Sequence, residues 1–255
     1  MSYQFRLIID TLHDAFYNMG MDLALLESVR QRKTLPTLRL YGWKPQAVSI
    51  GYFQGIEEEV DIPACESRGI SVVRRLTGGG AVFHDQEVTY SIVIPLDHPL
   101  ASYSIQESYA VLCQGIIKAL EKLNIRATFV PINDIVCEGK KISGNAQTRK
   151  QGGLLQHGTL LLSVNVDLMF ELLKVPQEKA RGRHIQEVKE RVTALDVLLG
   201  RPVSFREAQE VLTEGFAEAL NLQFKQEEPQ QNEIEEAYKL ARTFFSSSEW
   251  NFKRR

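Results

Sequence analysis

The sequence has few cysteines, and their arrangement excludes the usual cysteine-based scaffolds. The 255-residue chain contains three, Cys65, Cys113 and Cys137, which are widely spaced and form no Cys-x-x-Cys pair. An odd number of scattered cysteines argues against a disulfide framework and against a structural zinc site. A reducing compartment, the cytoplasm, is therefore the expected location.

Long hydrophobic runs and an excess of one charge are also missing. The first thirty residues are polar and charged, without the apolar core of a signal peptide, and no apolar run reaches membrane-spanning length. The net charge of −2 gives no basis for binding nucleic acid or an anionic membrane. The chain is 44% hydrophobic and 24% charged, as in ordinary globular proteins, and it is long enough to bury a full core.

The order of short apolar segments predicts an α+β fold. Most predicted strands are joined by hairpins rather than by helices, which favours a mixed, largely antiparallel sheet flanked by helices. We find no repeat and no linker, so residues 1–255 are expected to form one domain without a C-terminal accessory domain. Strands are expected at 5–9, 37–41, 47–52, 70–73, 88–94, 135–137, 141–147 and 154–162, and helices at 16–32, 62–69, 105–123, 166–173, 204–220 and 232–245.

Several of these helices begin with recognisable capping residues. Asn18 or Asp14 can cap the first long helix. Ser104 and Ser204 are each followed three positions later by a glutamate, which predicts two capping boxes. A basic, turn-prone stretch is expected after residue 173 and up to Arg191.

A glycine-rich stretch between two predicted strands is the most distinctive feature of the sequence. It reads Arg74-Arg75-Leu76-Thr77-Gly78-Gly79-Gly80-Ala81-Val82-Phe83-His84-Asp85. Consecutive glycines cost backbone entropy, but they let a bulky ligand approach the backbone, whose N–H groups can face an anion. The two arginines add charge suited to phosphate or carboxylate. The structural alternative is a glycine bulge beside a solvated arginine pair.

Two further clusters have the same character. In Lys140-Lys141-Ile142-Ser143-Gly144-Asn145-Ala146-Gln147, strict alternation places Lys141, Ser143 and Asn145 on one face of a strand. A hairpin lysine is commonly a solvated edge residue, yet the nearby pair Asn133-Asp134 could share an anion site with it. In Gln156-His157-Gly158-Thr159 a histidine interrupts an apolar strand, either as a satisfied core residue or as a pocket wall.

Taken in order, these motifs resemble those of the lipoate–protein ligase A family. The relatives of that family include the octanoyltransferases and, more distantly, the biotin–protein ligases. The resemblance runs from the first strand to Glu249-Trp250-Asn251-Phe252 and therefore covers nearly the whole chain. It implies the biotinyl/lipoyl-transferase catalytic domain, a mixed sheet flanked by helices.

The resemblance also implies a reaction and its residues. Such a ligase activates lipoate with ATP and Mg²⁺ as lipoyl-AMP and transfers lipoyl to a lysine of a lipoyl domain, in the glycine cleavage H protein or a 2-oxoacid dehydrogenase E2. Lys141 is the expected catalytic residue, near the acyl carbonyl and bridging phosphate. Asp134 is the expected Mg²⁺ ligand. The expected substrate- and nucleotide-binding residues are Arg75, Gly78, Gly79, Gly80, Ala81, His84, Asn133, Asp134, Ser143, Gly144, His157, Gly158 and Thr159, of which the two histidines line the pocket without acting as bases.

Three functions remain open on the sequence alone. Large single-chain ligases carry an accessory domain after the Glu-Trp-Asn-Phe region, whereas this chain ends at Arg255. This implies either a separate small accessory subunit or the transfer of a preformed acyl group. The third hypothesis is a module that binds lipoyl-adenylate or a lipoyl domain without catalysis.

The cysteines discriminate between ligase and transferase. Tyr41-Gly42-Trp43-Lys44-Pro45 and Ser49-Ile50-Gly51-Tyr52-Phe53-Gln54 resemble the octanoyltransferases, which use a cysteine to carry octanoyl from acyl carrier protein to a lipoyl domain. Cys137 is the only cysteine near the lysine hairpin, and Lys141 could activate it if it faced the pocket. Because Cys137 is expected to be structural and three glycines stand where Gly-Gly-Arg would favour the transferase, the ligase is the expected function.

Overall fold

The computed structural model describes residues 2–150, 152–174 and 190–254, whose strands form two sheets. The larger sheet has eight strands in the order β11-β1-β2-β6-β10-β9-β8-β7, and the smaller has three in the order β4-β3-β5. Most of the predicted basic stretch before Arg191 lies outside the described residues. The strands are β1 Tyr3–His13, β2 Thr37–Trp43, β3 Ala47–Ile50, β4 Ser71–Arg74, β5 Val82–His84, β6 Glu87–Pro95, β7 Thr128–Val130, β8 Asp134–Cys137, β9 Lys140–Lys150, β10 Gly153–Leu161 and β11 Leu222–Gln226.

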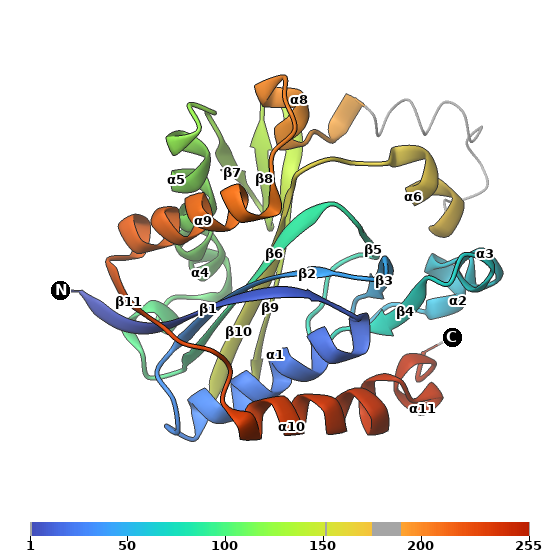
Figure 1. The fold of residues 1–255 in the computed structure, drawn as a ribbon, viewed down its shortest axis with the longest axis horizontal. Coiled ribbons are helices and arrows are strands. Elements are labelled where there is room, and N and C mark those ends of the chain that lie inside the picture. Colours follow the sequence, from blue (N-terminus) through green and yellow to red (C-terminus); the bar gives the residue numbers. More distant parts are fainter. Residues whose placement is uncertain (1, 151, 175–189, 255) are drawn as a thin grey trace.

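The predicted fold class is confirmed. In the large sheet β1 pairs in parallel with β2 and β11, and the remaining neighbours are antiparallel. Helices cover both faces of this sheet (Figure 1). They are α1 Ala15–Arg30, α2 Ile56–Glu59, α3 Ile62–Ser67, the 3₁₀ turn η1 Pro99–Ala101, α4 Ile105–Leu112, α5 Gln114–Lys122, α6 Val166–Leu172, α8 Leu195–Leu199, α9 Phe205–Leu220, α10 Gln231–Leu240, the π-helical turn η2 Ala241–Phe245 and α11 Ser248–Asn251.

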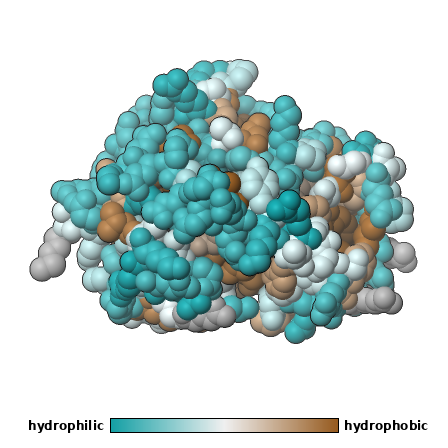
Figure 2. Space-filling view, turned by 60° about the horizontal axis from the view of Figure 1, so that its bottom comes forward, coloured by the Kyte–Doolittle hydropathy of each residue, from teal (hydrophilic) through white to brown (hydrophobic). Residues whose placement is uncertain are grey.

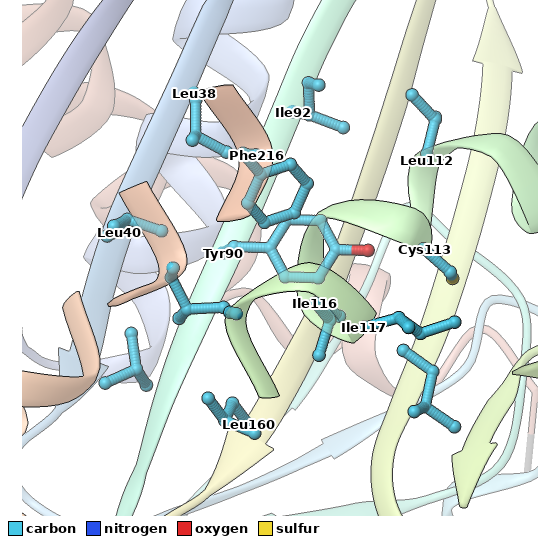
Figure 3. Packing of buried hydrophobic residues seen from close by; sticks show 14 of the residues in the cluster. Leu38, Leu40, Tyr90, Ile92, Leu112, Cys113, Ile116, Ile117, Leu160 and Phe216 are labelled. Carbon is cyan, nitrogen blue, oxygen red and sulfur yellow. The ribbon is translucent and has the colours of Figure 1, made fainter. Parts of the chain in front are cut away.

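The two faces of the large sheet carry separate hydrophobic clusters. On one face, α5 and α9 pack over a cluster centred on Tyr90, Phe216 and Cys113 (Figure 3). On the other face, α1 packs between the sheet and α10 through Met21, Leu25 and their neighbours. Each fully buried large apolar side chain contributes about 1.5–3 kcal/mol, so the two clusters hold the sheet rigid below the site.

The helix termini agree with the capping predictions except at one position. Asp14, and not Asn18, caps α1 by accepting bonds from two backbone N–H groups, and Ser104 with Glu107 forms a complete capping box. Ser204 caps α9, but the carboxylate of Glu207 pairs with Arg201 instead of closing the second box. The Glu207 carboxylate accepts two bonds from the Arg201 guanidinium, at 2.6 and 3.0 Å.

None of the helices in the described ranges combines the length and hydrophobicity that crossing a bilayer requires. Figure 2 shows a mostly hydrophilic face on the α10 side, with hydrophobic residues gathered toward the right, where the small sheet lies in Figure 1.

A buried arginine joins the small sheet to the C-terminal helix α11. Arg74, at the end of β4, donates to the carbonyl oxygens of Gly51, Gln54 and Asn251, among others. The side-chain oxygen of Asn251 also accepts from the backbone N–H of Arg74, and the indole N–H of Trp250 donates to the carbonyl oxygen of Arg74. The Glu-Trp-Asn-Phe motif near the C-terminus therefore binds the end of β4. The segment that follows β4, residues 75–81, contains the three consecutive glycines and is called the glycine loop below.

Candidate active site

A pocket lies between the small sheet, the glycine loop and one face of the large sheet. Lys141, Gly79 and Gly80, which are three of the expected site residues, line it together. Gly78, Asp134 and Ser143 are expected site residues that do not line it. The lining residues are Met19, Tyr41, Trp43, Ser49, Arg75, Gly79, Gly80, Ala81, Val82, His84, Thr89, Asn133, Lys141, Gly144, Asn145, Ala146, His157, Gly158 and Thr159.

Arg75 holds the glycine loop in shape from inside. Its guanidinium donates to the carbonyl oxygens of Gly78 and Gly80, each at 2.9 Å, and to the carbonyl and hydroxyl oxygens of Ser49. Its Nε contacts the hydroxyl of Thr77 at 3.4 Å, so all five N–H groups have partners within the chain. Burial lowers the pKa of Arg75 to about 10, and the side chain still carries its charge at neutral pH.

The glycines allow close approach of two backbone segments. A Cβ at Gly51 would lie 2.0 Å from the carbonyl oxygen of Gly79, which has a φ of +90°. At Gly80 a Cβ would meet no atom within 4 Å. The loop is therefore pressed against the end of β3 at Gly79 and leaves open space at Gly80.

Lys141 is placed by a bulge that the sequence did not predict. Val136 pairs with Lys141 and Ile135 pairs with Ser143, so Ile142 is an extra residue in β9. The expected alternation, with Lys141 and Ser143 on one face, is therefore wrong at this point. Ser143 is fully buried, while the side chain of Lys141 stays 41% exposed.

The ammonium group of Lys141 lies over Gly144. A Cβ at Gly144 would be 2.9 Å from both Cε and Nζ of Lys141. The Nζ also lies 2.7 Å from a carboxylate oxygen of Asp134. This ion pair orients the lysine toward the pocket, and the Mg²⁺ role expected for Asp134 stays a prediction.

A second pocket adjoins the first. The two share lining residues at Ala81, Val82, Lys141, Gly144 and Thr159. Lys141 therefore lies where the two pockets meet, and a substrate in either pocket can reach a group that is bound at this junction.

His157 lies in a buried hydrogen-bond chain beneath the glycine loop. Its Nδ1 is 3.0 Å from Asp22 on α1, and its Nε2 is 2.7 Å from the hydroxyl of Thr77. Burial lowers the pKa of His157 in spite of the neighbouring carboxylate. The imidazole is thus neutral at neutral pH, and it lines the pocket as predicted.

His84 lies in a second chain, which reaches a residue that the sequence reasoning missed. Its Nε2 is 2.6 Å from the hydroxyl of Ser49, and its Nδ1 is 2.7 Å from Glu87. The ring stacks on Trp43 with centroids 3.9 Å apart. The sequence contains one indication of Ser49, namely that it is the polar residue in the otherwise apolar strand Ala47-Val48-Ser49-Ile50.

Asn133 and Gly158 have structural contacts that account for their identities. The side-chain amide of Asn133 donates to the carbonyl oxygen of Asn145. In return, the backbone N–H and the side-chain amide of Asn145 both donate to the carbonyl oxygen of Asn133. A Cβ at Gly158 would lie 2.1 Å from the side-chain oxygen of Asn145 and 2.7 Å from Tyr90. Asn133 thus holds the loop before β8 against β9, and Gly158 leaves room for the Asn145 side chain, while both residues line the pocket.

None of the three cysteines of the chain lines the pocket. Cys113 and Cys137 belong to the cluster under α5 and α9, and Cys65 packs behind the small sheet. Burial raises the pKa of Cys113 to about 12 and the pKa values of Cys137 and Cys65 to about 11. Cys137 pairs with Lys140 and packs in the core, as the structural interpretation expects, and does not face the pocket as a nucleophile in the transferase alternative would need to.

The sequence comparisons give one family and one recurrent activity. Residues 14–217 match the family described as the lipoyl protein ligase A/B catalytic domain. An octanoyltransferase LipM of Geobacillus kaustophilus is 39% identical, and that of Anoxybacillus flavithermus is 38% identical. Each alignment covers 93% of this chain and 94% of the relative. The LipM octanoyltransferase of Bacillus subtilis is 35% identical with the same coverage.

Similar solved structures are lipoate–protein ligases. A bipartite lipoate–protein ligase of Thermoplasma acidophilum, described together with its E2 lipoyl domain, is 30% identical with a TM-score of 0.88. The alignment covers 98% of this chain and 96% of that one. A lipoate–protein ligase A bound with ATP is 28% identical with a TM-score of 0.82, and the alignment covers 99% of both chains.

Proposed function

Because the chain belongs to the lipoyl protein ligase A/B catalytic-domain family, we propose that it is an octanoyltransferase that moves an octanoyl group onto a lysine of a lipoyl domain. The observation that carries the proposal is the 35–39% identity to LipM octanoyltransferases over nearly the full length of both chains. The same comparison overturns the expectation that the chain is an ATP-dependent lipoate ligase.

The pocket supports an aliphatic acyl group. Met19, Tyr41, Trp43 and Val82 supply apolar surface on several sides, and burial of a methylene contributes about 0.8 kcal/mol. An octanoyl chain against these side chains places its carbonyl carbon toward the polar end of the pocket, where Lys141 and the glycine loop meet.

Lys141 supplies charge where the reaction develops it. Attack on an acyl carbonyl produces a negatively charged oxygen, which a fixed ammonium stabilises more strongly than water does. The ion pair with Asp134 and the contact with Gly144 hold that ammonium at the junction of the two pockets. The second pocket then gives the acceptor lysine a separate approach to the carbonyl carbon.

The proposed donor is the octanoyl thioester of acyl carrier protein. A thioester is already activated, so this reaction needs neither ATP and Mg²⁺ nor the accessory subunit that the sequence left open. Arg75 uses all five of its N–H groups within the chain, so in this conformation it offers none to a phosphate. The H protein and an E2 lipoyl domain are both proposed acceptors.

The first experiment measures octanoyl transfer with Lys141 replaced. Purified protein is mixed with octanoyl-acyl carrier protein and an apo lipoyl domain, without ATP, and the lipoyl domain is followed by intact mass spectrometry. Lys141→Met should reduce the rate about 100-fold or more, the range found when one oxyanion donor is removed. The exposed neighbour Lys140 is the matched control, and Lys140→Met should keep the rate.

The same assay, with lipoate and ATP in place of octanoyl-acyl carrier protein, tests the competing reaction, which is ATP-dependent ligation of lipoate. Transfer from octanoyl-acyl carrier protein without ATP supports the proposal. Modification of the lipoyl domain only when lipoate and ATP are both present would reject it.

A further inference from the structure

Two lysines share one tyrosine ring beside the small sheet. Tyr52 follows β3, and Trp250 belongs to α11, which lies next to the small sheet in Figure 1. The ammonium group of Lys253 lies 3.3 Å from the ring centroid of Tyr52 and 3.6 Å from that of Trp250. The ammonium group of Lys150 lies 4.2 Å from the centroid of the same Tyr52 ring. Each contact is favourable, because the face of an aromatic ring attracts a cation, but together they hold two like charges close to each other.

An arginine and an exposed phenylalanine extend this group. The guanidinium carbon of Arg254 lies 5.3 Å from the ring centroid of Phe53. Phe53 is 68% exposed, and aromatic residues and arginines are enriched where proteins bind one another. The four exposed residues are named here the cationic surface, and they are Phe53, Lys150, Lys253 and Arg254.

The positive charge of the cationic surface is not neutralised locally. In the part of the chain that the structure describes, no carboxylate forms an ion pair with its two lysines or its arginine. Burial and the charges of three neighbouring cations lower the pKa of Lys253 to about 8, and these cations are Arg74, Lys150 and Arg254. Since the whole chain has a net charge of −2, such a local concentration of positive charge favours an anionic partner.

The cationic surface adjoins the glycine loop. Tyr52 donates its backbone N–H to the carbonyl oxygen of Thr77 at 2.8 Å. A Cβ at Gly78 would lie 3.9 Å from the ring of Phe53. The next two residues of the loop, 79–80, line the first pocket. A partner that binds the cationic surface therefore lies beside the glycine-loop wall of the pocket proposed for the acyl group.

Strand β9 connects the cationic surface to the same pocket. Ala146 lines the pocket, and Lys150 follows four residues later on that strand. At about 3.3 Å per residue, the two positions are about 13 Å apart. A carrier protein presents its thioester at the end of a long, flexible pantetheine arm, which spans such a distance. The carrier can thus stay on the surface while its acyl chain occupies the pocket.

The second pocket has the opposite charge, which favours the donor over the acceptor as the partner of the cationic surface. Asp85 and Glu87 line the second pocket, through which the acceptor lysine is proposed to approach. Carboxylates suit the ammonium group of that lysine. None of the four residues of the cationic surface lines this second pocket.

We propose that the cationic surface docks the carrier protein that delivers the octanoyl thioester, through acidic side chains of that carrier. This inference rests on the proposed octanoyl transfer and adds to it the contact that selects the donor. Charges at the rim of an interface act mainly by steering association, so the surface should govern how efficiently the donor is captured and not the chemical step.

The test measures the KM for octanoyl-acyl carrier protein in the transfer assay, with full-length protein and a saturating apo lipoyl domain. In the double variant Lys150→Glu with Lys253→Glu, the KM should rise about tenfold or more, while kcat changes less than about twofold. Raising NaCl from about 50 to about 500 mM should raise the wild-type KM and affect the variant much less, because salt screens charges on exposed surfaces.

Two controls separate docking from folding and from total charge. Octanoyl-pantetheine is a thioester without the carrier protein, and the wild type and the double variant should use it equally well. A second double variant, Arg126→Glu with Arg206→Glu, makes the same change in net charge at exposed positions before β7 and on α9. It should keep the wild-type KM for octanoyl-acyl carrier protein.

The outcomes distinguish the docking surface from the function on which it rests. If the KM for octanoyl-acyl carrier protein is the same in the wild type and the Lys150→Glu, Lys253→Glu variant, the docking surface is wrong and the transferase stands. A rise in the KM for the lipoyl domain alone would assign the surface to the acceptor and overturn the proposal. An equal loss with octanoyl-pantetheine would also overturn it, since the substitutions would then act on the site itself. If the wild type transfers octanoyl from neither donor, the proposed function fails first.

Discussion

Gly144 shows how a missing side chain places a charge. The ammonium group of Lys141 occupies the volume that a Cβ at Gly144 would need, 2.9 Å from Nζ. The sequence predicted both residues as part of the site, but it could not predict this contact. The contact depends on the bulge at Ile142, and one extra residue in a strand leaves no mark in a period-two pattern.

Gly144→Ala should therefore disable the lysine without unfolding the protein. The new methyl group must push the flexible end of Lys141 aside, and we expect the transfer rate to fall about tenfold while the melting temperature changes little. The measurement is the octanoyl-transfer assay on Gly144→Ala, Lys141→Met and the double variant. Because both substitutions act on one ammonium, the double variant should be no slower than Lys141→Met. Additive losses would show that Gly144 serves another group.

Other residues at the site could be predicted by type but not by partner. Arg75 was expected to meet substrate charge, and instead it donates to the carbonyl oxygens of its own loop. Asn133 likewise bonds the backbone of β9. The residue type at a position tells which hydrogen-bond donors are present, whereas the tertiary fold determines which acceptors they meet. Ser49 was missed for the same reason, since a single serine in a short strand is also a common surface residue.

At the scale of elements, the long periodic segments were predictable, whereas only some of the short ones were. The predicted helix at 105–123 is confirmed as α4 and α5, interrupted at Cys113, and the predicted helix at 232–245 ends in the π-helical turn of η2. The strands β5, β7 and β11 were missed. They have three to five residues each, so tertiary pairing decides their conformation more than local pattern does.

The glycine loop gives an element-scale prediction that contrasts two glycines. Gly51→Ala places a methyl group 2.0 Å from the carbonyl oxygen of Gly79, so the loop must move and stability should fall by about 1–3 kcal/mol. Gly80→Ala meets no atom within 4 Å and should leave stability within about 0.5 kcal/mol. Urea unfolding followed by circular dichroism measures both. Equal destabilisation by the two substitutions would show that the loop is not held at Gly79.

At the scale of the whole molecule, buried polar pairs add a second set of links between layers that hydrophobic packing also joins. Arg6 on β1 forms a fully buried pair with Glu233 on α10, with nitrogen–oxygen distances of 2.8 Å. Asp22 on α1 accepts from Tyr41 on β2 and pairs with His157 on β10. Removing one partner of a buried pair costs about 3–5 kcal/mol. These links fix α1 and α10 to the sheet that forms the pocket floor, and no spacing in the sequence indicated them.

The buried histidines predict how stability depends on pH. Burial lowers the pKa of His157, and of His98, below the ordinary value of 6.5. Below about pH 6.5 the unfolded chain therefore binds protons that the native state does not, so the free energy of unfolding should fall as the pH is lowered from 7.5 to 5.5. Asp10, whose pKa is lowered below 3.8 by His13 and Arg39 although desolvation opposes this, acts in the same direction only below about pH 4.

The measurement is urea unfolding at pH 7.5, 6.5 and 5.5 on the wild type, on His157→Gln and on a variant with both His157→Gln and His98→Gln. Each substitution removes one group that takes up a proton on unfolding, so the slope of stability against pH should be reduced in the single variant and nearly absent in the double variant. Both variants are less stable at pH 7.5, since Asp22 and Thr77 lose their common partner; the slope, rather than the absolute value, is therefore the test. A wild type whose stability stays constant or rises between pH 7.5 and 5.5 would contradict the neutral, buried state assigned to His157.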